Sequence, residues 1–408
     1  MPSQPESVDC CIVGAGPAGM MLGLLMARVG LEVRVLEMHQ DFERDFRGDT
    51  VHASTLELLD QIGLADRLLA LPHARLRHMA LHTPTRTIEV ADFSRLPSRF
   101  PFVAVMPQAR FLEFLCAEAE RYPGFRCIRG AAVQDLLRED GVVRGVSMHH
   151  EGRLQPLRAA LTVAADGRFS RIRKLSGLAA ERSAPPMDVC WLRLPRRSSD
   201  GHDTGAFFVG GGRMLVCLPR AQSWQIGYVF PKGDFAQLRA QGLSALHAAV
   251  AETAPWLADR VRSVAAWSDV HLLSVRADCL SRWHRDGLLL IGDAAHVMSP
   301  VGGVGINVAI GDAVAAANVL AQPEAALLQR GKPPESALQR IQSRRLRAVR
   351  LTQAVQSAIQ RTLVKRALSG RPFDLPAPLK LLLATPGLRQ LPVRIFALGI
   401  PRERLVLR

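Results

Sequence analysis

Three glycines near the start of the chain have the spacing of a dinucleotide-binding turn. Gly14, Gly16 and Gly19 follow the apolar run CCIV and give G-x-G-x-x-G ahead of a helix-like stretch. In such a motif the first glycine makes the turn, the second lets a pyrophosphate approach the backbone, and the third lets helix and strand pack closely. The free N–H groups that start the helix attract phosphate oxygens. The spacing therefore predicts a cofactor site, although it does not distinguish NAD from FAD.

Glu37 ends the strand that completes this first unit. MMLGLLMARVG is expected to form a helix that lies on a sheet, and EVRVLE is expected to form the next strand. Glu37 comes 18 residues after Gly19, where a carboxylate can accept hydrogen bonds from ribose hydroxyls. Strand, turn, helix, strand and acid thus occur in the order of a βαβ dinucleotide-binding unit.

Two later stretches place acidic residues directly after apolar strands. LTVAADGRFSRIRKLSGL (161–178) contains Asp166, and DGLLLIGDAAHVMSPVGGVGINVAIGDAVAAANVLA (286–321) contains Asp293, then a glycine-rich segment and a helix of small residues. Together with the first motif they resemble the three-part signature of the class A flavoprotein monooxygenases, the para-hydroxybenzoate hydroxylase type of aromatic hydroxylase. The resemblance covers residues 9 to about 320.

The resemblance implies FAD as the cofactor and assigns residues to it by position. The first glycines would hold the pyrophosphate, Glu37 the adenosine ribose and Asp293 a ribityl hydroxyl, while the backbone of residues 300–307 would face the flavin. A helix that begins near Gly305 favours the negative charge of a reduced flavin. The implied cofactor-binding set is Gly14, Ala15, Gly16, Pro17, Ala18, Gly19, Glu37, Met38, Arg47, Gln108, Val133, Asp166, Gly292, Asp293, Pro300, Gly303, Val304, Gly305, Ile306 and Asn307.

Arg47 and Gln108 lie outside the three motifs. At two further positions this sequence differs from the usual family pattern. Arg47 would lie along the cofactor, and Gln108 would reach the ribityl chain or the phosphates. Val304 stands where many family members have glutamine, and Ala309 where glycine is common. Because the backbone faces the cofactor there, we expect FAD binding to be retained.

The resemblance also implies NADPH or NADH and O₂ as co-substrates. The chain has no second G-x-G-x-x-G, so the nicotinamide cofactor is expected to bind transiently in a surface groove near Asp166. Arg47, Arg171 and Arg173 could pair with its phosphates, since guanidinium groups match phosphate oxygens. The alternative for Arg171 and Arg173 is the solvated start of a helix.

In this family a hydride passes from NAD(P)H to FAD, and reduced flavin reacts with O₂ to form a flavin hydroperoxide that hydroxylates or epoxidises the substrate. His52 and Tyr228 are the candidate catalytic side chains, since a base can deprotonate a phenol. Each has a structural alternative: a helix-capping or satisfied histidine, and a tyrosine that only packs in a strand. His296 is interpreted as structural support beside the cofactor.

Other functions of the same scaffold stay open. An FAD-dependent reductase or dehydrogenase, such as a prenyl-chain reductase, would reduce a double bond without O₂. A flavin halogenase is a further alternative, although the W-x-W-x-I-P stretch of tryptophan halogenases is absent. A flavin-holding scaffold without turnover is disfavoured by the intact motifs.

An α/β fold with two domains is needed to position these residues. We expect a Rossmann-like FAD-binding domain of residues 1–75, 100–180 and 276–335, with an inserted β-sheet substrate domain of residues 76–99 and 181–275. DVCWLRLPR, GAFFVGG, RMLVCLPR and WQIGYVF indicate strands separated by turns. Residues 336–408 are expected to form a helical C-terminal segment. The apolar strands and only two tyrosines favour an apolar aromatic or polycyclic substrate.

Composition limits the remaining classes. The 408 residues include seven cysteines without a C-x-x-C pair, which favours reduced thiols and no metal site. No apolar run is expected to cross a bilayer, and no signal peptide is expected, so a cytoplasmic protein is the default. The net charge of +15 and the basic cluster 339–353 favour solvated helix faces over nucleic-acid binding. The aliphatic, arginine-rich tail is expected to pack on the protein, with membrane contact as the alternative. The oligomeric state stays open.

Overall fold

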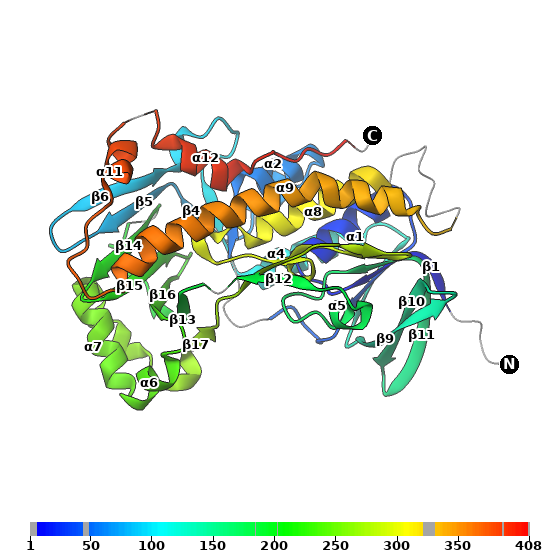
Figure 1. Cartoon of the computed structure of the whole chain (residues 1–408), viewed down its shortest axis with the longest axis horizontal. Helices are drawn as coiled ribbons and strands as arrows, with labels where there is room; N and C mark the ends of the chain where they lie inside the picture. The colour runs from blue at the N-terminus through cyan, green and yellow to red at the C-terminus, as the bar shows by residue number, and fades with distance from the viewer. Residues whose placement is uncertain are drawn as a thin grey trace.

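A mixed sheet carries the dinucleotide motif at one end of the molecule (Figure 1). The computed structural model describes residues 6–43, 49–183, 185–201, 203–320, 331–385 and 387–406. The parallel strands run in the order β20 (Leu288–Leu290), β11 (Arg153–Ala164), β1 (Ser7–Val13), β2 (Val33–Glu37) and β8 (Phe125–Arg129). β19 (His284–Arg285) pairs with β20, and the hairpin β9 (Ala132–Glu139)–β10 (Val142–His150) pairs with β11.

Three helices bury one face of this sheet. They are α1 (Pro17–Arg28), α4 (Gln108–Ala119) and α8 (Gly305–Leu320). α1 begins with proline at its first helical position, where the missing N–H costs nothing. Its apolar side chains from Met20 to Met26 are buried against α8 and α4. The hairpin β9–β10 covers the other face. Both faces of the parallel strands are therefore buried, as parallel sheets require.

A second sheet has seven strands and combines segments that are far apart in the sequence. Its order is β17 (His271–Leu273), β13 (Met187–Pro195), β16 (Ser223–Pro231), β15 (Arg213–Pro219), β14 (Thr204–Gly210), β5 (His78–His82) and β6 (Thr87–Asp92). β5 pairs in parallel with β14. This pairing brings the hairpin β5–β6 beside strands that come more than a hundred residues later.

The two faces of the second sheet meet different partners. One face packs against α6 (Phe235–Ala240) and α7 (Leu243–Thr253), which lie at the lower left of Figure 1. The opposite face carries Val189, Trp191 and Val229 and packs against Val301, in the turn before α8. The second sheet therefore faces the start of α8 with apolar side chains.

The long helix α9 (Glu335–Ile359) joins the two parts (Figure 1). It packs along α8 and continues into a π-helical turn, Gln360–Val364, and α10 (Lys365–Ala367). α11 (Ala377–Ala384) has no buried residue, whereas α12 (Gln390–Leu398) buries Val393 and Ala397. Much of the described tail thus packs on the protein, while α11 contributes only the half-buried Leu379 and Leu383 to an apolar cluster.

Short elements fill the junction between the sheets. α2 (Ala53–Gln61) and α3 (Ala65–Leu69) follow β3 (Thr50–Val51), which pairs with β7 (Val103–Val105), and β4 (Ala74–Leu76) pairs with β7 too. β18 (Ala277–Leu280) lies between β12 (Ala180–Ser183) and β21 (His296–Val297). α5 (Arg171–Ser176) follows β11. The remaining short turns are the 3₁₀ helices Phe93–Arg95, Pro255–Leu257, Val261–Ser263, Trp267–Asp269, Gly292–Ala294 and Val301–Gly303.

One expectation about apolar runs needs correction. The helical stretch Val301–Leu320 is long and apolar enough, by length and composition, to cross a membrane. However, 72% of its most apolar window is buried inside the protein, because α8 packs between α1 and α9. Glycines interrupt the apolar pattern of this run in the sequence, and the fold uses the run as a core helix.

Candidate cofactor site and active site

The first glycine turn is packed too tightly for side chains at two of its three glycines. Gly14 has φ +101°, and a Cβ there would lie 2.5 Å from the carbonyl oxygen of Ala165. A Cβ on Gly19 would lie 2.0 Å from the carbonyl oxygen of Gly14. These two glycines therefore allow β1, α1 and the end of β11 to meet.

Gly16 differs from its neighbours because open space lies beside it. The nearest atom that a Cβ at this position would meet is the Ala165 carbonyl oxygen, 3.9 Å away. Gly16 is the N-cap of α1 and has no side chain to cap the helix, so the first N–H groups of α1 are available to an anion. The fold itself thus tolerates a side chain here, and the free room fits a pyrophosphate.

Glu37 lies beside the same turn. Its side chain is buried, with Oε2 accepting from the Ala15 N–H at 3.2 Å and Oε1 accepting from the His39 N–H at 3.0 Å. The strand β2 therefore delivers a carboxylate to the turn, as a ribose contact requires. Of the other predicted residues nearby, Met38 is 63% exposed and Val133 is buried on β9.

Asp166 caps the helix that follows it. Its Oδ1 accepts from the Ser170 hydroxyl at 2.5 Å and its Oδ2 from the Ile172 N–H at 3.1 Å. Burial raises the pKa of this carboxyl, and these hydrogen bonds oppose the rise. Gly167, with φ +81° and nothing within 4 Å of a Cβ, leaves open space next to it.

The two arginines of α5 that are predicted to contact the nicotinamide cofactor have different partners in the structure. Arg173 forms a two-pronged ion pair with Asp278, with nitrogen–oxygen distances of 3.0 and 3.3 Å, so its guanidinium has a buried partner. Arg171 is exposed, and its Nε donates to the carbonyl of Gln134 at 2.8 Å. Of the two guanidinium groups, that of Arg171 is the more accessible to solvent. Arg47 lies outside the described residues.

Open space also lies at the start of α8. A Cβ on Gly305, the first residue of the helix, would have nothing within 4 Å. Gly303 has φ +62°, and a Cβ there would lie 2.7 Å from the Thr50 hydroxyl. Asp293 follows Gly292 in a short 3₁₀ turn and is half-buried. A half-buried helix N-terminus with room beside its first residue is suited to hold the flavin end of FAD.

The predicted residues around this helix start have differing exposure. Pro300 and Asn307 are half-buried, whereas Val304 and Ile306 are buried among apolar residues. Gln108, the first residue of α4, is half-buried. Only the backbone of Val304 and Ile306 is therefore suited to face a cofactor.

Asn307 fastens the start of α8 to the segment that follows residue 48. Its Oδ1 accepts from the His52 N–H and from the Thr55 hydroxyl, both at 2.8 Å. Its Nδ2 donates to the Thr50 carbonyl at 3.2 Å. The predicted cofactor residue Asn307 thus uses its side chain to join two segments, which leaves its backbone to face the flavin.

His52 is a buried histidine with a structural partner. Its Nδ1 lies 2.9 Å from the Phe396 carbonyl oxygen in α12, and the residue is the N-cap of α2. Burial lowers its pKa to about 4, against the opposing effect of backbone hydrogen bonds. The ring is therefore neutral at pH 7, and the geometry favours the structural alternative over a catalytic role.

The structure places Tyr228 on the side of its strand that faces away from the cofactor segment. The ring lies in the cluster covered by α7, beside Phe230, whereas Val229 lies in the cluster that contains Val301. Neighbouring residues of a strand point to opposite faces. Tyr228 is therefore not retained as a candidate base.

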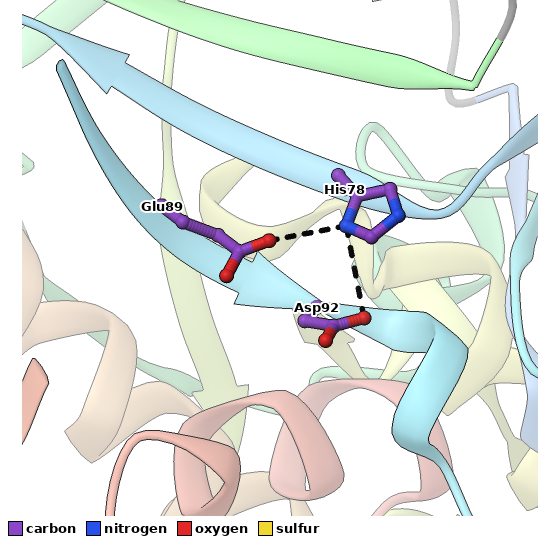
Figure 2. A group of neighbouring side chains, drawn as sticks. All are labelled: His78, Glu89 and Asp92. Carbon is purple, nitrogen blue, oxygen red and sulfur yellow. Dashed lines mark hydrogen bonds and ion pairs between the residues drawn. The ribbon is translucent and has the colours of Figure 1, made fainter. Parts of the chain in front are cut away.

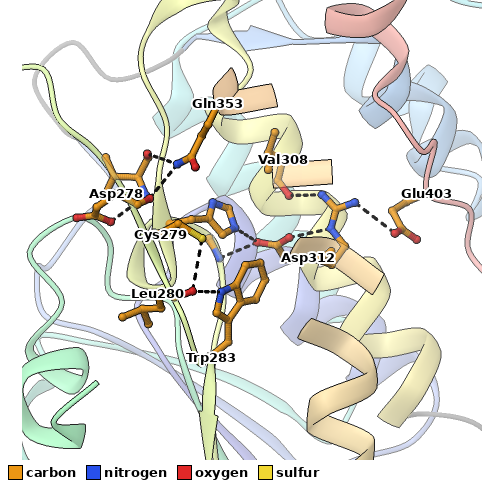
Figure 3. A network of polar contacts seen from close by, with 12 residues as sticks. Asp278, Cys279, Leu280, Trp283, Val308, Asp312, Gln353 and Glu403 are labelled. Carbon is orange, nitrogen blue, oxygen red and sulfur yellow. Dashed lines mark hydrogen bonds and ion pairs between the residues drawn. The ribbon is translucent and has the colours of Figure 1, made fainter. Parts of the chain in front are cut away.

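A buried network of charged side chains holds the Gly292–Asp293 turn against α8 (Figure 3). Asp312 of α8 accepts from the Gly292 N–H at 3.0 Å and from His296 Nε2 at 2.6 Å through Oδ2, and from Arg345 Nε at 2.8 Å through Oδ1. Arg345 reaches Glu403 at 3.2 Å. The Gly292–Asp293 turn is thereby tied to α8, α9 and the tail.

Opposing effects set the charge of this network. Burial alone would raise the pKa of Asp312, but His296 and the Arg345 guanidinium outweigh it and hold the pKa below its usual value. Asp312 therefore stays ionised at neutral pH. The interpretation of His296 as structural support matches these contacts, whereas Asp312, Arg345 and Glu403 lie too far apart in sequence for any motif to reveal them.

A second polar cluster contains possible metal ligands (Figure 2). His78 Nδ1 lies 3.1 Å from Glu89 Oε1 and 3.7 Å from Asp92 Oδ1, on the hairpin β5–β6. Asp92 also accepts from the Ser94 N–H and pairs with Arg95 at 2.9 Å. These donors already neutralise Asp92, so we do not assign a metal to this cluster.

Comparison with known proteins adds to this geometry. The family model described as FAD binding domain matches residues 7–357. The 6-methylpretetramide 4-monooxygenase of Streptomyces rimosus is 36% identical over 326 residues, which are 79% of this chain and 77% of that protein. These matches cover both sheets and α8, and they favour the monooxygenase over the reductase and halogenase alternatives.

Solved structures share the fold. P. aeruginosa PqsL in complex with 2-aminobenzoylacetate has a TM-score of 0.75 at 20% identity, over 90% of this chain and 98% of that one. The OxyS anhydrotetracycline hydroxylase from Streptomyces rimosus has a TM-score of 0.71 at 24% identity, over 96% of this chain and 76% of that one. The predicted α/β fold class is confirmed. The chain belongs to the FAD binding domain family and is a class A FAD-dependent aromatic monooxygenase, with NAD(P)H and O₂ as the usual co-substrates of its class.

Proposed function

We propose that FAD extends from the Gly16 turn, past Glu37 and Asp293, to the start of α8 at Gly305. Open space at Gly16 and Gly305, each at a helix N-terminus, supports this path. Asp166 and Gly167 lie beside the first turn, since a Cβ on Gly14 would touch Ala165. The discontinuous FAD-binding domain and the inserted substrate domain that we predict from the sequence form part of this proposal.

We propose further that the substrate is an apolar, polycyclic phenol. The observation that carries this proposal is the apolar face of the second sheet: Trp191, Met214 and Val216 pack in the same cluster as Val301, the residue before the flavin-facing glycines. Trp191 lies flat on Gly227, where a Cβ would come within 2.9 Å of its ring. The relative from Streptomyces rimosus, named for a pretetramide substrate, supports a fused-ring compound.

The chain's residues would orient the reactants and keep water out. When bound, reduced FAD activates O₂ for transfer to an aromatic ring. Trp191 and the adjoining valines would hold the substrate ring above the start of α8 and exclude water, which would otherwise release hydrogen peroxide. The α8 N-terminus would favour negative charge on the reduced ring. Tyr228 and His52 supply no base in this arrangement, so we assign the chemistry no side-chain base.

A substrate panel tests the proposal. Purified enzyme is given NADPH or NADH with fused-ring phenols or single-ring phenols, and product mass, reduced-cofactor consumption and hydrogen peroxide are measured. Fused-ring phenols should accelerate NAD(P)H consumption and gain one oxygen atom. Acceleration by single-ring phenols alone would contradict the proposed substrate class.

Two variants on opposite faces of the same sheet sharpen this test. Trp191→Ala should weaken substrate binding and raise the fraction of hydrogen peroxide, with KM rising about tenfold. Tyr228→Phe, on the face covered by α7, is the matched control and should leave KM unchanged. Equal effects of the two substitutions would overturn the assignment of the substrate face.

We also propose that the enzyme is cytoplasmic. All seven cysteines are free thiols, and Cys10, Cys11, Cys190 and Cys217 are buried, as suits a reducing compartment.

A further inference from the structure

Three glutamines of α9 and the π-helical turn after it donate to the stretch Val297–Val301, and one of them also donates to β18. Gln353 Nε2 donates to the carbonyls of Asp278 and Val297, at 2.9 and 3.1 Å. Gln356 Nε2 donates to the carbonyls of Ser299 and Val301, both at 2.8 Å. Figure 3 shows the first of these side chains above Asp278. A single helix thereby holds the backbone from β21 to the turn before α8.

In the turn Ser299–Val301, the carbonyls of Ser299 and Val301 both accept from α9, and the Ser299 hydroxyl accepts from the π-helical turn. Gln360 Nε2, at the start of the π-helical turn, donates to the Ser299 hydroxyl at 2.5 Å, and that hydroxyl accepts from the Val301 N–H at 3.3 Å. Gln356 and Gln360 are 1% and 4% exposed. π-helical turns often occur at functional sites. This one contacts the turn Ser299–Val301, which leads to the glycines that face the proposed flavin.

The orientation of the Gln356 carboxamide is fixed by its partners. Both partners are carbonyl oxygens, so a flipped amide would set oxygen against oxygen. Its Oε1 has no hydrogen-bond donor among the described residues. The Gln356 carboxamide is therefore held by the same two carbonyls that it positions. A side chain without N–H donors at this position would not keep the turn in place.

This turn leads directly into the glycines that face the proposed flavin. Gly303 and Gly305 follow Val301 by two and four residues. The Val301 side chain packs with the apolar face of the second sheet, where we propose that the substrate binds. We propose that Gln356 and Gln360 are positioning residues that set the place of the flavin ring against the substrate. This inference rests on the cofactor path proposed above.

Gln353, three residues before Gln356, makes the same kind of carboxamide contact and supplies a matched control. Gln356→Glu replaces the donor with a carboxylate that faces two carbonyls, and Gln353→Glu does the same against Asp278 and Val297. We expect both variants to lose similar thermal stability. Only Gln356→Glu should shift the visible absorption of bound FAD, change its reduction potential and weaken FAD binding about tenfold.

Gln356→Met removes the donor without adding charge and serves if Gln356→Glu fails to fold. It should also raise the fraction of NAD(P)H oxidation that ends as hydrogen peroxide, while Gln353→Met leaves that fraction unchanged. An unaltered FAD spectrum, potential and peroxide fraction in Gln356→Met, alongside the same Tm loss as Gln353→Met, would overturn the inference. If instead Gly16→Ala bound FAD like the wild type, the proposed cofactor path itself would fail.

Discussion

The two ends of the proposed cofactor path are built in different ways. At the pyrophosphate end, Gly14, Gly16 and Gly19 lie within six residues, and local backbone makes the site. At the flavin end, Gln356 of α9 donates to the carbonyls of the turn before α8, and Thr55 of α2 donates to Asn307 at the start of α8. Short-range motifs therefore specify the first end, whereas tertiary contacts specify the second.

Gly16→Ala should show the largest effect at the first end. The nearest atom to the added Cβ would be 3.9 Å away, so the protein without cofactor should keep its Tm. FAD affinity should fall on the order of 100-fold, because the methyl group fills the pyrophosphate space. Flavin fluorescence titration measures the affinity. Gly201→Ala, whose Cβ would have no atom within 4 Å, is the control, and equal affinities for both variants would show that the site lies elsewhere.

Asp312→Ala should be the largest change at the second end. Removing the carboxylate leaves Arg345 buried at 4% exposure, which should cost about 3–5 kcal/mol of unfolding free energy. Urea unfolding of the wild type and the variant measures this loss. Glu139→Gln breaks the exposed ion pair with Arg158 and should leave the unfolding curve unchanged. A small loss for Asp312→Ala would mean that the network is dispensable.

His52 should produce a smaller, pH-dependent effect. Its pKa of about 4 lies below the ordinary value of 6.5, so its contribution to stability is complete above pH 6.5. That contribution is lost as the pH falls toward 4, by about 2 kcal/mol between pH 7 and pH 5. In His52→Asn, which keeps a donor near Phe396, this part of the pH dependence should disappear. Parallel stability curves for both proteins would contradict a buried neutral imidazole.

The smallest effect is expected at the hairpin β5–β6, far from both ends. His78→Ala removes a half-exposed contact to Glu89, so Tm and FAD affinity should stay within error. Dialysis of the wild type against EDTA should likewise leave NAD(P)H oxidation unchanged, since we assign no metal there. A loss of stability on chelation would reveal a bound cation at His78, Glu89 and Asp92.

Prediction from sequence succeeds where residues close in the chain make the structure, and fails where tertiary contacts make it. The βαβ unit, the acids after strands and the fold class depend on residues close in the chain, and their spacing is informative. The face to which Tyr228 points depends on which helices cover the sheet, and the partner of His52 is a carbonyl 344 residues away. Gln356, Asp312 and Glu403 carry no local pattern, because their roles exist only once α9 lies on α8.

The contacts of the tail have a consequence for biosynthesis. Asn318 of α8 donates to the Arg404 carbonyl and accepts from the Val406 N–H, both at 2.8 Å, while Arg345 pairs with Glu403. A nascent chain whose first 400 residues have left the ribosome therefore still lacks the backbone partners of Asn318 and one of the two carboxylates that pair with Arg345. Chaperone contact with the emerging polypeptide should persist until residues 403–406 have cleared the exit tunnel.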